Sequence, residues 1–462
     1  MITELRILPP LAIARLGSSP TPLENYDLEL PEDPLGFRTI RPAETLIVDN
    51  SSGEVSGSKI PDKIVFRDSD RIRPVAPFFE VFVRIGDGEL QPLTIRLLTE
   101  YGLSPADVKW SVEAGNLKVF RRTGNEKDRV KAELNSISDH GSHALEGKCN
   151  HFVSKDTFLP LGSVRYIRPN GTYPEIRLRY TPAEGKVYGS STERKKLDPT
   201  KKIVEETDPV ITSDRVIYDS SPGRGQWRDW VDPGLPTDTN PGQIYAGFQN
   251  ADGNQQSWGY LDDECDGVVI VSLRVGDRSL SAFARFGAGP PMFAPDGLPI
   301  RTVADELEQA LFGPMADETV TLADAEEIVR RAFETVRLMN TAVMNGNTIH
   351  GRTAVASAMP SQDSNDTSRL YAPIMAPTLV DNLAVVALHK GIFAALRSGT
   401  SAWFLDVLRQ PEEVGDLTDK GRRKMPAMMR GADGRYLTLT RRQIDIIRKI
   451  AVMGPFPSGG TK

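Results

Sequence analysis

The chain is poor in the residues that build disulfide-stapled or histidine-rich proteins. Its 462 residues include only two cysteines and five histidines. Cys149 and Cys265 cannot form a disulfide framework for a chain of this length, so we expect two free thiols in a reducing compartment. The sequence therefore predicts a cytoplasmic protein.

An excess of positive charge and long apolar runs are also missing. The 62 Asp and Glu outnumber the 56 Lys and Arg, and the net charge of −6 is spread along the chain without basic blocks. This balance argues against nucleic acid or an anionic membrane as a partner. No apolar run approaches the ~20 residues that a membrane helix needs, and the N-terminus lacks the pattern of a signal peptide. We expect a soluble protein.

What the chain contains is typical of a folded protein with more than one core. Hydrophobic residues make up 39% and charged residues 26% of the sequence, an ordinary globular balance. A length of 462 residues exceeds what one core normally organises, so we expect two or three structural regions.

Patterns typical of β-strands dominate the first 300 residues. Residues 268–273 and 280–286 are strand-like runs around the tight-turn pair Gly276-Asp277, which predicts a hairpin. A second pair of runs lies on either side of Asn170-Gly171. Further strands are expected at 7–16 (broken by a proline pair), 71–85, 93–98 and 109–112, with mostly loops at 17–70 and a polar excursion at 122–156.

The remainder of the chain has helical periodicity. Residues 321–345 predict an amphipathic helix, and 371–397 and 402–408 also have helical character. A final helix at 440–453 has Thr440 as its N-cap and Gly454 just after its end. We predict an α+β protein, with a β-rich region at 1–300 and an appended, mainly helical region at 301–462.

Several runs, in the same order, resemble one family. The chain resembles the amino-acid oxidases that carry cysteine tryptophylquinone, the L-lysine 6-oxidase and glycine oxidase family. The similar runs are LPPLAIARLGSSP, RIRPVAPFFEVFV, WSVEAGNLKV with its Asn-x-Lys turn, WGYLDDECDGVVIVSL followed by ARFGAGPPMFAP, RRKMPAMMRG, and LTLTRRQIDIIRKIAVMGPF with its Leu-Thr-x-x-Gln helix. The resemblance implies a related scaffold with a β-rich N-terminal part.

The sequence departs from the family's pattern at the quinone. In that family a Cys and a Trp beyond the Leu-Thr-x-x-Gln helix form the quinone, whereas this sequence stops at Lys462, shortly after that helix. We therefore expect a truncated member without the family's own quinone, and no family catalytic residue is carried over. The cofactor and the catalytic residues are left unknown.

One cluster of side chains suggests a metal. His140, His143, Cys149 and His151 lie within twelve residues, and imidazole and thiolate are good zinc ligands. Their spacing matches no standard zinc pattern, so the alternative is a polar surface loop with incidental histidines.

The acidic turn at 262–267 has a similar ambiguity. Asp262, Asp263, Glu264 and Asp266 could collect a cation such as calcium. The spacing of an EF-hand is absent, and Asp and Gly commonly build turns by bonding backbone N–H groups. We favour the structural interpretation.

Tryptophans suggest two further hypotheses. Trp227, Trp230 or Trp258 could form a relocated cross-link with Cys265, although buried aromatic residues are far more often core. The long loop 207–241 carries Arg224, Trp227 and Trp230, and long loops often carry function. We predict that these three residues form a wall of the substrate pocket.

Three functions are compatible with these observations. The first is an oxidoreductase-like enzyme acting on an amino acid or amine, with a metal, a relocated cross-link or a partner chain in place of the quinone. The second is a non-catalytic binding or companion subunit that retains the scaffold, because a fold does not determine an activity. The third is a non-redox enzyme that uses the same pocket. A homo-oligomer is compatible with each of them.

Overall fold

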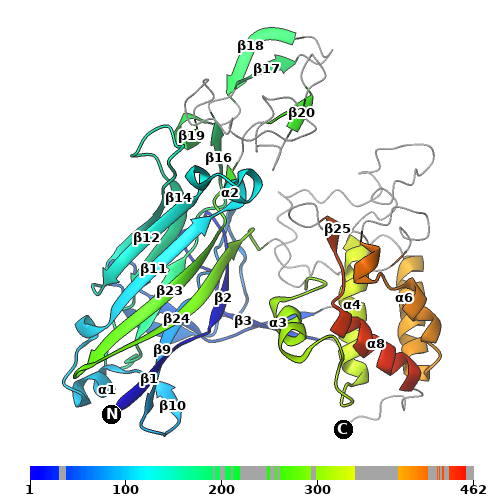
Figure 1. Ribbon diagram of the computed structural model, residues 1–462, viewed down its shortest axis with the longest axis horizontal. Coiled ribbons are helices and arrows are strands. Elements are labelled where there is room, and N and C mark those ends of the chain that lie inside the picture. The colour runs from blue at the N-terminus through cyan, green and yellow to red at the C-terminus, as the bar shows by residue number, and fades with distance from the viewer. Residues whose placement is uncertain are drawn as a thin grey trace. The chain divides into compact units, whose positions relative to one another are not determined.

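The computed structural model describes residues 1–30, 38–190, 193–197, 203–209, 212–218, 247–249, 255–257, 261–292, 298–338, 383–414, 424, 426, 429–430 and 436–453. The chain divides into two compact units, one made of Met1–Asn25 and Pro42–Phe293 and the other of Tyr26–Arg41 and Ala294–Lys462. Strands dominate the first unit and helices the second (Figure 1).

The first unit is built on two β-sheets. The larger has the order β1 (Ile2–Leu8), β9 (Phe78–Ile85), β15 (Arg177–Thr181), β14 (Leu159–Tyr166) and β13 (Ser142–Gly147), and β10 (Leu90–Pro92) also pairs with β9. The other has the order β12 (Val130–Ile137), β11 (Lys109–Asn116), β23 (Cys265–Val275), β24 (Arg278–Gly289) and β2 (Leu11–Arg15). All of these pairs are antiparallel except β2 with β24, which is parallel.

The two sheets pack face to face on a shared core. Side chains alternate between the faces of a strand, so β23 buries Cys265, Val269, Val271 and Leu273 and turns Asp266 and Arg274 outward. Aromatic rings cross the interior, with centroids 6.1 Å apart for Trp110 and Tyr166 and 4.2 Å apart for Tyr180 and Phe286. Such aromatic pairs add to the hydrophobic stabilisation of the core.

Both predicted hairpins are confirmed. The strands β23 and β24 pair from Cys265↔Ala288 to Val275↔Arg278, and Gly276 adopts the left-handed conformation at their turn. The strands β14 and β15 pair on either side of Asn170-Gly171. The predicted break at the proline pair is also confirmed, because β1 ends at Leu8 and β2 begins at Leu11.

Two predictions for this unit are wrong. Residues 93–98 are not a strand, since α1 (Ile95–Glu100) begins there and Thr94 caps it by accepting a hydrogen bond from the Leu97 amide at 3.3 Å. Residues 122–156 are not a polar excursion, because they contain β12 and β13. Their exposed faces are polar, but Val130, Ala132 and Leu145 face the core.

The remaining elements are short. The segment 17–70, expected to be mostly loops, also contains small strands. The short strands are β3 (Tyr26–Glu29), β4 (Thr39–Pro42), β5 (Thr45–Val48), β6 (Val55–Lys59), β7 (Arg67–Asp68), β8 (Arg71–Ile72), β16 (Val187–Ser190), β17 (Glu193–Leu197), β18 (Ile203–Pro209), β19 (Val216–Tyr218), β20 (Gly247–Gln249), β21 (Gln255–Ser257), β22 (Leu261–Asp262), β25 (Met429–Arg430) and β26 (Tyr436–Leu437). One short helix, α2 (Lys118–Thr123), follows β11.

The second unit packs its helices around a separate core. Its helices are α3 (Val303–Phe312), α4 (Leu322–Leu338), α6 (Leu383–Ser398) and α8 (Arg441–Met453), with a 3₁₀ segment at Ala402–Val407. The core is formed mainly by Val329 and Phe333 of α4, Phe393 of α6, and Ile444 and Ile447 of α8. Among the described residues, no helix is long and apolar enough to cross a membrane.

The helical predictions for this unit hold within the described residues. The predicted helix at 321–345 is seen as α4, and its residues 339–345 lie outside the described part. The predicted helix at 371–397 is seen as α6 from Leu383, and the segment at 402–408 is 3₁₀ rather than α. Thr440 caps α8 as predicted, while Gly454 lies outside the described residues. The protein is a mixed α+β protein.

Candidate functional site

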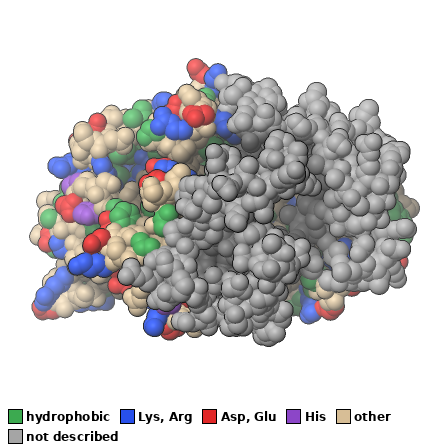
Figure 2. Space-filling view, turned by 90° about the horizontal axis from the view of Figure 1, so that it is seen from above, with side chains coloured by type: hydrophobic (Ala, Val, Ile, Leu, Met, Phe, Trp, Pro, Cys, Tyr) green, Lys and Arg blue, Asp and Glu red, His purple; other side chains and the backbone are tan. Residues whose placement is uncertain are grey.

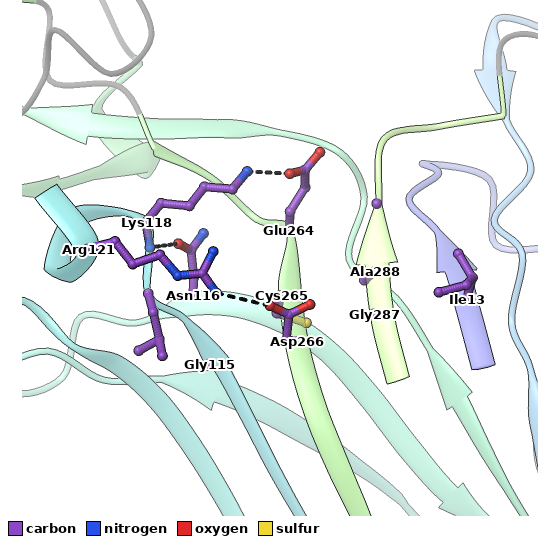
Figure 3. A pocket seen from close by; sticks show the side chains of 12 residues that line it. Ile13, Gly115, Asn116, Lys118, Arg121, Glu264, Cys265, Asp266, Gly287 and Ala288 are labelled. Atoms are coloured by element: carbon purple, nitrogen blue, oxygen red, sulfur yellow. Dashed lines mark hydrogen bonds and ion pairs between the residues drawn. The ribbon is translucent and has the colours of Figure 1, made fainter. Parts of the chain in front are cut away.

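A pocket of about 260 Å³ opens at one end of the five-stranded sheet of the first unit (Figure 3). Its walls come from β2, the end of β11, the start of α2, the start of β23 and the end of β24. The lining residues that matter below are Ile13, Asn116, Lys118, Arg121, Glu264, Asp266 and Gly287. They are drawn from three distant parts of the sequence, so only the folded sheet assembles them.

The strand register lines up one row of pocket residues across the sheet. Asp266 of β23 lies opposite Gly115 of β11 on one side and Gly287 of β24 on the other, and Gly287 lies opposite Ile13 of β2. Residues opposite each other share a face of the sheet. Asp266 and Ile13 are exposed, so this row lies on the face turned away from the core. Cys265, one position earlier, points inward instead, with its Sγ 3.2 Å from the Tyr180 hydroxyl.

The acidic turn before β23 is anchored to the start of α2. Lys118 Nζ lies 2.7 and 2.6 Å from the two carboxylate oxygens of Asp262 and also pairs with Glu264. Asn116 donates from Nδ2 to the Asp262 carbonyl at 2.8 Å, and its Oδ1 accepts from the Lys118 amide at 3.1 Å. The Asn-x-Lys run and the acidic turn therefore form one unit.

A second charged pair at the pocket is loose. Arg121 Nη2 lies 3.7 Å from Asp266 Oδ2, and the two side chains are 55% and 79% exposed. An exposed pair at that distance contributes little to stability. Lys118 is held by two carboxylates, whereas Arg121 and Asp266 have charge that a ligand could engage.

A third cation reaches the rim of the pocket. A Cβ atom at Gly289 would lie 3.0 Å from Arg15 Nη1, so the guanidinium of Arg15 extends over this glycine. On the face seen in Figure 2, acidic and basic side chains of the described residues are interspersed rather than gathered by sign.

Asp263 belongs to the acidic turn but does not line the pocket. It is fully buried, and its Oδ2 accepts from the amides of Gly185 at 3.1 Å and Lys186 at 3.0 Å. Its Oδ1 has no hydrogen-bond partner among the described residues. Burial raises the pKa of Asp263 to about 6, although the two backbone amides act in the opposite direction. This carboxyl ties the turn to the segment before β16.

The four residues of the predicted metal site make separate contacts. His140 Nδ1 donates to the Tyr166 carbonyl at 3.0 Å, His143 Nε2 lies 3.0 Å from Asp139, His151 Nδ1 lies 2.8 Å from Asp128, and the Cys149 thiol donates to the Lys127 carbonyl at 2.9 Å. Burial raises the pKa of the Cys149 thiol. In the part of the chain that the structure describes, no three His, Cys, Asp or Glu side chains are grouped as a metal site.

The carboxylates of the acidic turn at 262–267 also make separate contacts instead of forming a metal site. Asp262 turns to Lys118 and Asp263 to the Gly185 and Lys186 amides, so their carboxylates do not converge on one cation. The local bond expected in such a turn is weak, at 3.4 Å from the Glu264 amide to Asp262 Oδ1. The turn is stabilised mainly by residues distant in the sequence.

The predicted pocket wall and cross-link involve residues that lie outside the described part of the chain. These are Arg224, Trp227, Trp230 and Trp258. Cys149 and Cys265 are not joined in a disulfide. The hypothesis of a cross-link between Cys265 and a tryptophan is therefore not tested by the described residues.

No motif in the sequence points to Ile13, Arg121 or Gly287 as pocket residues. The Asn-x-Lys run and the acidic turn each stood out as motifs, but nothing in the sequence indicated that they meet. Pairing of β11 with β23 brings them together, and pairing of β24 with β2 adds Gly287 and Ile13.

Comparison with known proteins gives a distant match. No protein-family model matches the chain, and no curated protein sequence matches it. Among solved structures, the epsilon-lysine oxidase from Marinomonas mediterranea is similar, with a TM-score of 0.40 and 14% sequence identity over 99% of this chain and 62% of that chain. The present chain thus spans less than two thirds of the length of that protein.

Proposed function

We propose that the pocket between α2 and the ends of β23 and β24 binds a small amino acid or amine, and that the protein is an oxidoreductase-like enzyme acting on that ligand. The observation that carries the binding proposal is the loose pair of Arg121 and Asp266, whose charged atoms lie 3.7 Å apart at the pocket. The redox part is supported by the sequence runs that resemble quinone-dependent amino-acid oxidases.

The charges of the pair match the two ends of an amino acid. The α-ammonium group of the ligand would pair with the Asp266 carboxylate, and its α-carboxylate would pair with the Arg121 guanidinium. The ligand would thus take the place of the direct contact between the two side chains. Guanidinium groups bind carboxylates through paired N–H donors. The exchange keeps the site neutral and sacrifices only a weak, exposed ion pair.

The neighbouring groups hold the start of α2 in place and leave the Asp266 carboxylate available to a ligand. Lys118 is fixed by Asp262 and Glu264, so it does not neutralise Asp266. Asn116 holds the start of α2, the helix that carries Arg121. Because both ligand-binding groups are largely exposed, we expect weak binding, with a dissociation constant on the order of 1 mM.

Calorimetric titration with glycine, leucine and n-butylamine tests the binding proposal. Asp266→Asn should abolish binding of all three ligands, because each carries an ammonium group. Arg121→Gln should weaken the affinity for the two amino acids more than the affinity for the amine, which has no carboxylate. Arg274→Gln, an exposed arginine at the opposite end of β23, is the matched control. Absence of binding to the wild-type protein would overturn the proposal.

A second measurement tests the redox part. Ligands that bind should be oxidised, with release of hydrogen peroxide in air or reduction of an artificial electron acceptor. Intact mass and a visible absorption spectrum of the purified protein would reveal a cross-linked cofactor. Binding without oxidation would rule out the redox part and leave a binding or companion protein, or a non-redox enzyme.

A further inference from the structure

We propose that Gly287 and Ile13 form a subsite for the side chain of the bound amino acid and that this subsite selects aliphatic side chains over basic ones. This inference rests on the proposed binding of an amino acid at Arg121 and Asp266. It adds the direction in which the ligand lies and the residues that set its size.

The first support is that the backbone does not require a glycine at position 287. Gly287 lies inside β24 and is not among the glycines of positive φ. A Cβ atom there would meet Asp266 Oδ1 at 3.4 Å and Ile13 Cδ1 at 3.9 Å, which are ordinary contacts. Glycine weakens a strand, and it often marks a place where a ligand approaches the backbone. The absent side chain leaves space beside Asp266.

Gly267 shows what a structurally required glycine looks like in the same sheet. A Cβ atom at Gly267 would lie 2.1 Å from Phe286 Cζ and 2.6 Å from the Glu113 carbonyl oxygen. Packing therefore excludes any side chain at 267, whereas no comparable obstacle exists at 287. The open space at Gly287 lies on the outer face, inside the pocket.

The second support is the order of residues across the sheet. α2 with Arg121 follows β11, Asp266 is on β23, Gly287 on β24 and Ile13 on β2, and Figure 3 shows them in this order. An amino acid with its carboxylate at Arg121 and its ammonium at Asp266 would direct its side chain over Gly287. Neighbouring strands lie ~4.8 Å apart, so a side chain of a few carbons reaches Ile13.

The third support is the chemistry at the end of this row. Ile13 is an apolar side chain that is 45% exposed, so covering it with an aliphatic group removes apolar surface from water. Arg285 lies two residues before Gly287 on the same face, and Arg15 extends over Gly289 two residues after it. These two cations disfavour a second positive charge on the ligand.

Titrations with glycine, leucine, lysine and glutamate test the selectivity. Leucine should bind the wild-type protein more tightly than glycine, and lysine more weakly than leucine. Gly287→Val and Ile13→Ala should each lower the ratio of leucine to glycine affinity, by about 10-fold for the valine, which fills the subsite. Gly57→Ala, at a strand glycine with open space around it, is the matched control for the loss of a glycine.

The outcomes separate the two proposals. If the wild-type protein binds none of the four ligands, the proposed function itself fails. If it binds glycine and leucine but neither variant changes their affinity ratio, the subsite is wrong and the function stands. Tighter binding of glutamate or lysine than of leucine would also overturn an aliphatic subsite. Thermal unfolding monitored by circular dichroism verifies that each variant folds, and Ile13→Ala keeps the test valid if Gly287→Val does not.

Discussion

Lys118 Nζ lies 2.6 Å from the Asp262 carboxylate, across 144 positions of the sequence. The contact joins the first turn of α2 to the acidic turn before β23, and Glu264 shares the same ammonium group. Lys118 and Asp262 are both less than one third exposed, so the pair is better shielded from solvent than a surface ion pair. It fixes the wall of the pocket to which Arg121 belongs.

Replacement of Lys118 by Met should destabilise the first unit by about 1–2 kcal/mol, because two half-buried carboxylates lose their shared cation. The free energy of unfolding in urea measures the effect. Arg96→Met is the control, since the pair of Arg96 with Glu100 is mostly exposed and should contribute little. Equal losses for the two variants would show that the Lys118 contact is no stronger than a surface pair.

Asp263 should make the stability of the first unit fall as pH rises. Its pKa is about 6 in the folded protein, above the value of 3.8 that is ordinary for Asp. The neutral carboxyl therefore favours the fold fully below pH ~4, and this contribution is lost as pH rises through 6, by about 3 kcal/mol in all. Asp263→Asn cannot ionise, so relative to wild type it should gain stability between pH 4 and pH 8.

Urea midpoints at pH 4, 6 and 8 check this expectation. Asp277→Asn, an exposed residue of the β23–β24 turn, is the control and should follow the wild-type pH dependence. Parallel curves for wild type and Asp263→Asn would contradict the expected penalty for burying the ionised carboxyl.

Local signals in the sequence predict the hairpins and several helices well. The Gly276-Asp277 pair specifies its turn through glycine's tolerance of positive φ, and Thr440 caps α8 through a side-chain bond to its own third helical position. Each of these depends on residues close together in the chain. The strand β12 is harder to predict, because its exposed Lys131 and Glu133 alternate with small or single core residues, Val130 and Ala132.

The pocket could not be predicted, because it depends on pairing between distant strands. Asp266 looked like one more residue of an acidic turn, and register alone places it between Gly115 and Gly287. Proximity in sequence was misleading for the histidines, since His140 and His151 lie near each other in the chain yet turn to Tyr166 and Asp128. Spacing does not fix the direction of side chains on separate elements.

The Leu-Thr-x-x-Gln run of α8 has a structural role that mutation can test. The backbone N–H of Gln443 donates to Thr440 Oγ1 at 3.0 Å, and the backbone N–H of Thr440 donates to Gln443 Oε1 at 2.8 Å, which together form a capping box. Thr440→Ala should destabilise the second unit by about 1 kcal/mol. Thr440→Ser keeps the hydroxyl and should cost less. Thermal unfolding of both variants measures the difference, and equal losses would mean that the cap bond is unimportant.

The two glycines opposite and beside Phe286 should respond very differently to the same substitution. Gly267→Ala places a methyl group 2.1 Å from Phe286 Cζ, and Phe286 cannot move easily because it is buried against Tyr180. We expect a loss of about 3 kcal/mol or more in the free energy of unfolding. Gly287→Ala meets only ordinary contacts and should leave stability nearly unchanged or raise it, since alanine is less costly than glycine in a strand.

Phe286→Leu tests whether the Phe286 ring or the Glu113 backbone is the main obstacle to a side chain at position 267. If the ring is the main obstacle, Gly267→Ala should cost less in the Phe286→Leu background than in wild type, although the Glu113 carbonyl at 2.6 Å prevents full recovery. Urea unfolding of the four proteins in this cycle gives the coupling energy. Equal stability of Gly267→Ala and Gly287→Ala would remove the distinction on which the subsite at Gly287 depends, because both glycines would then be equally replaceable.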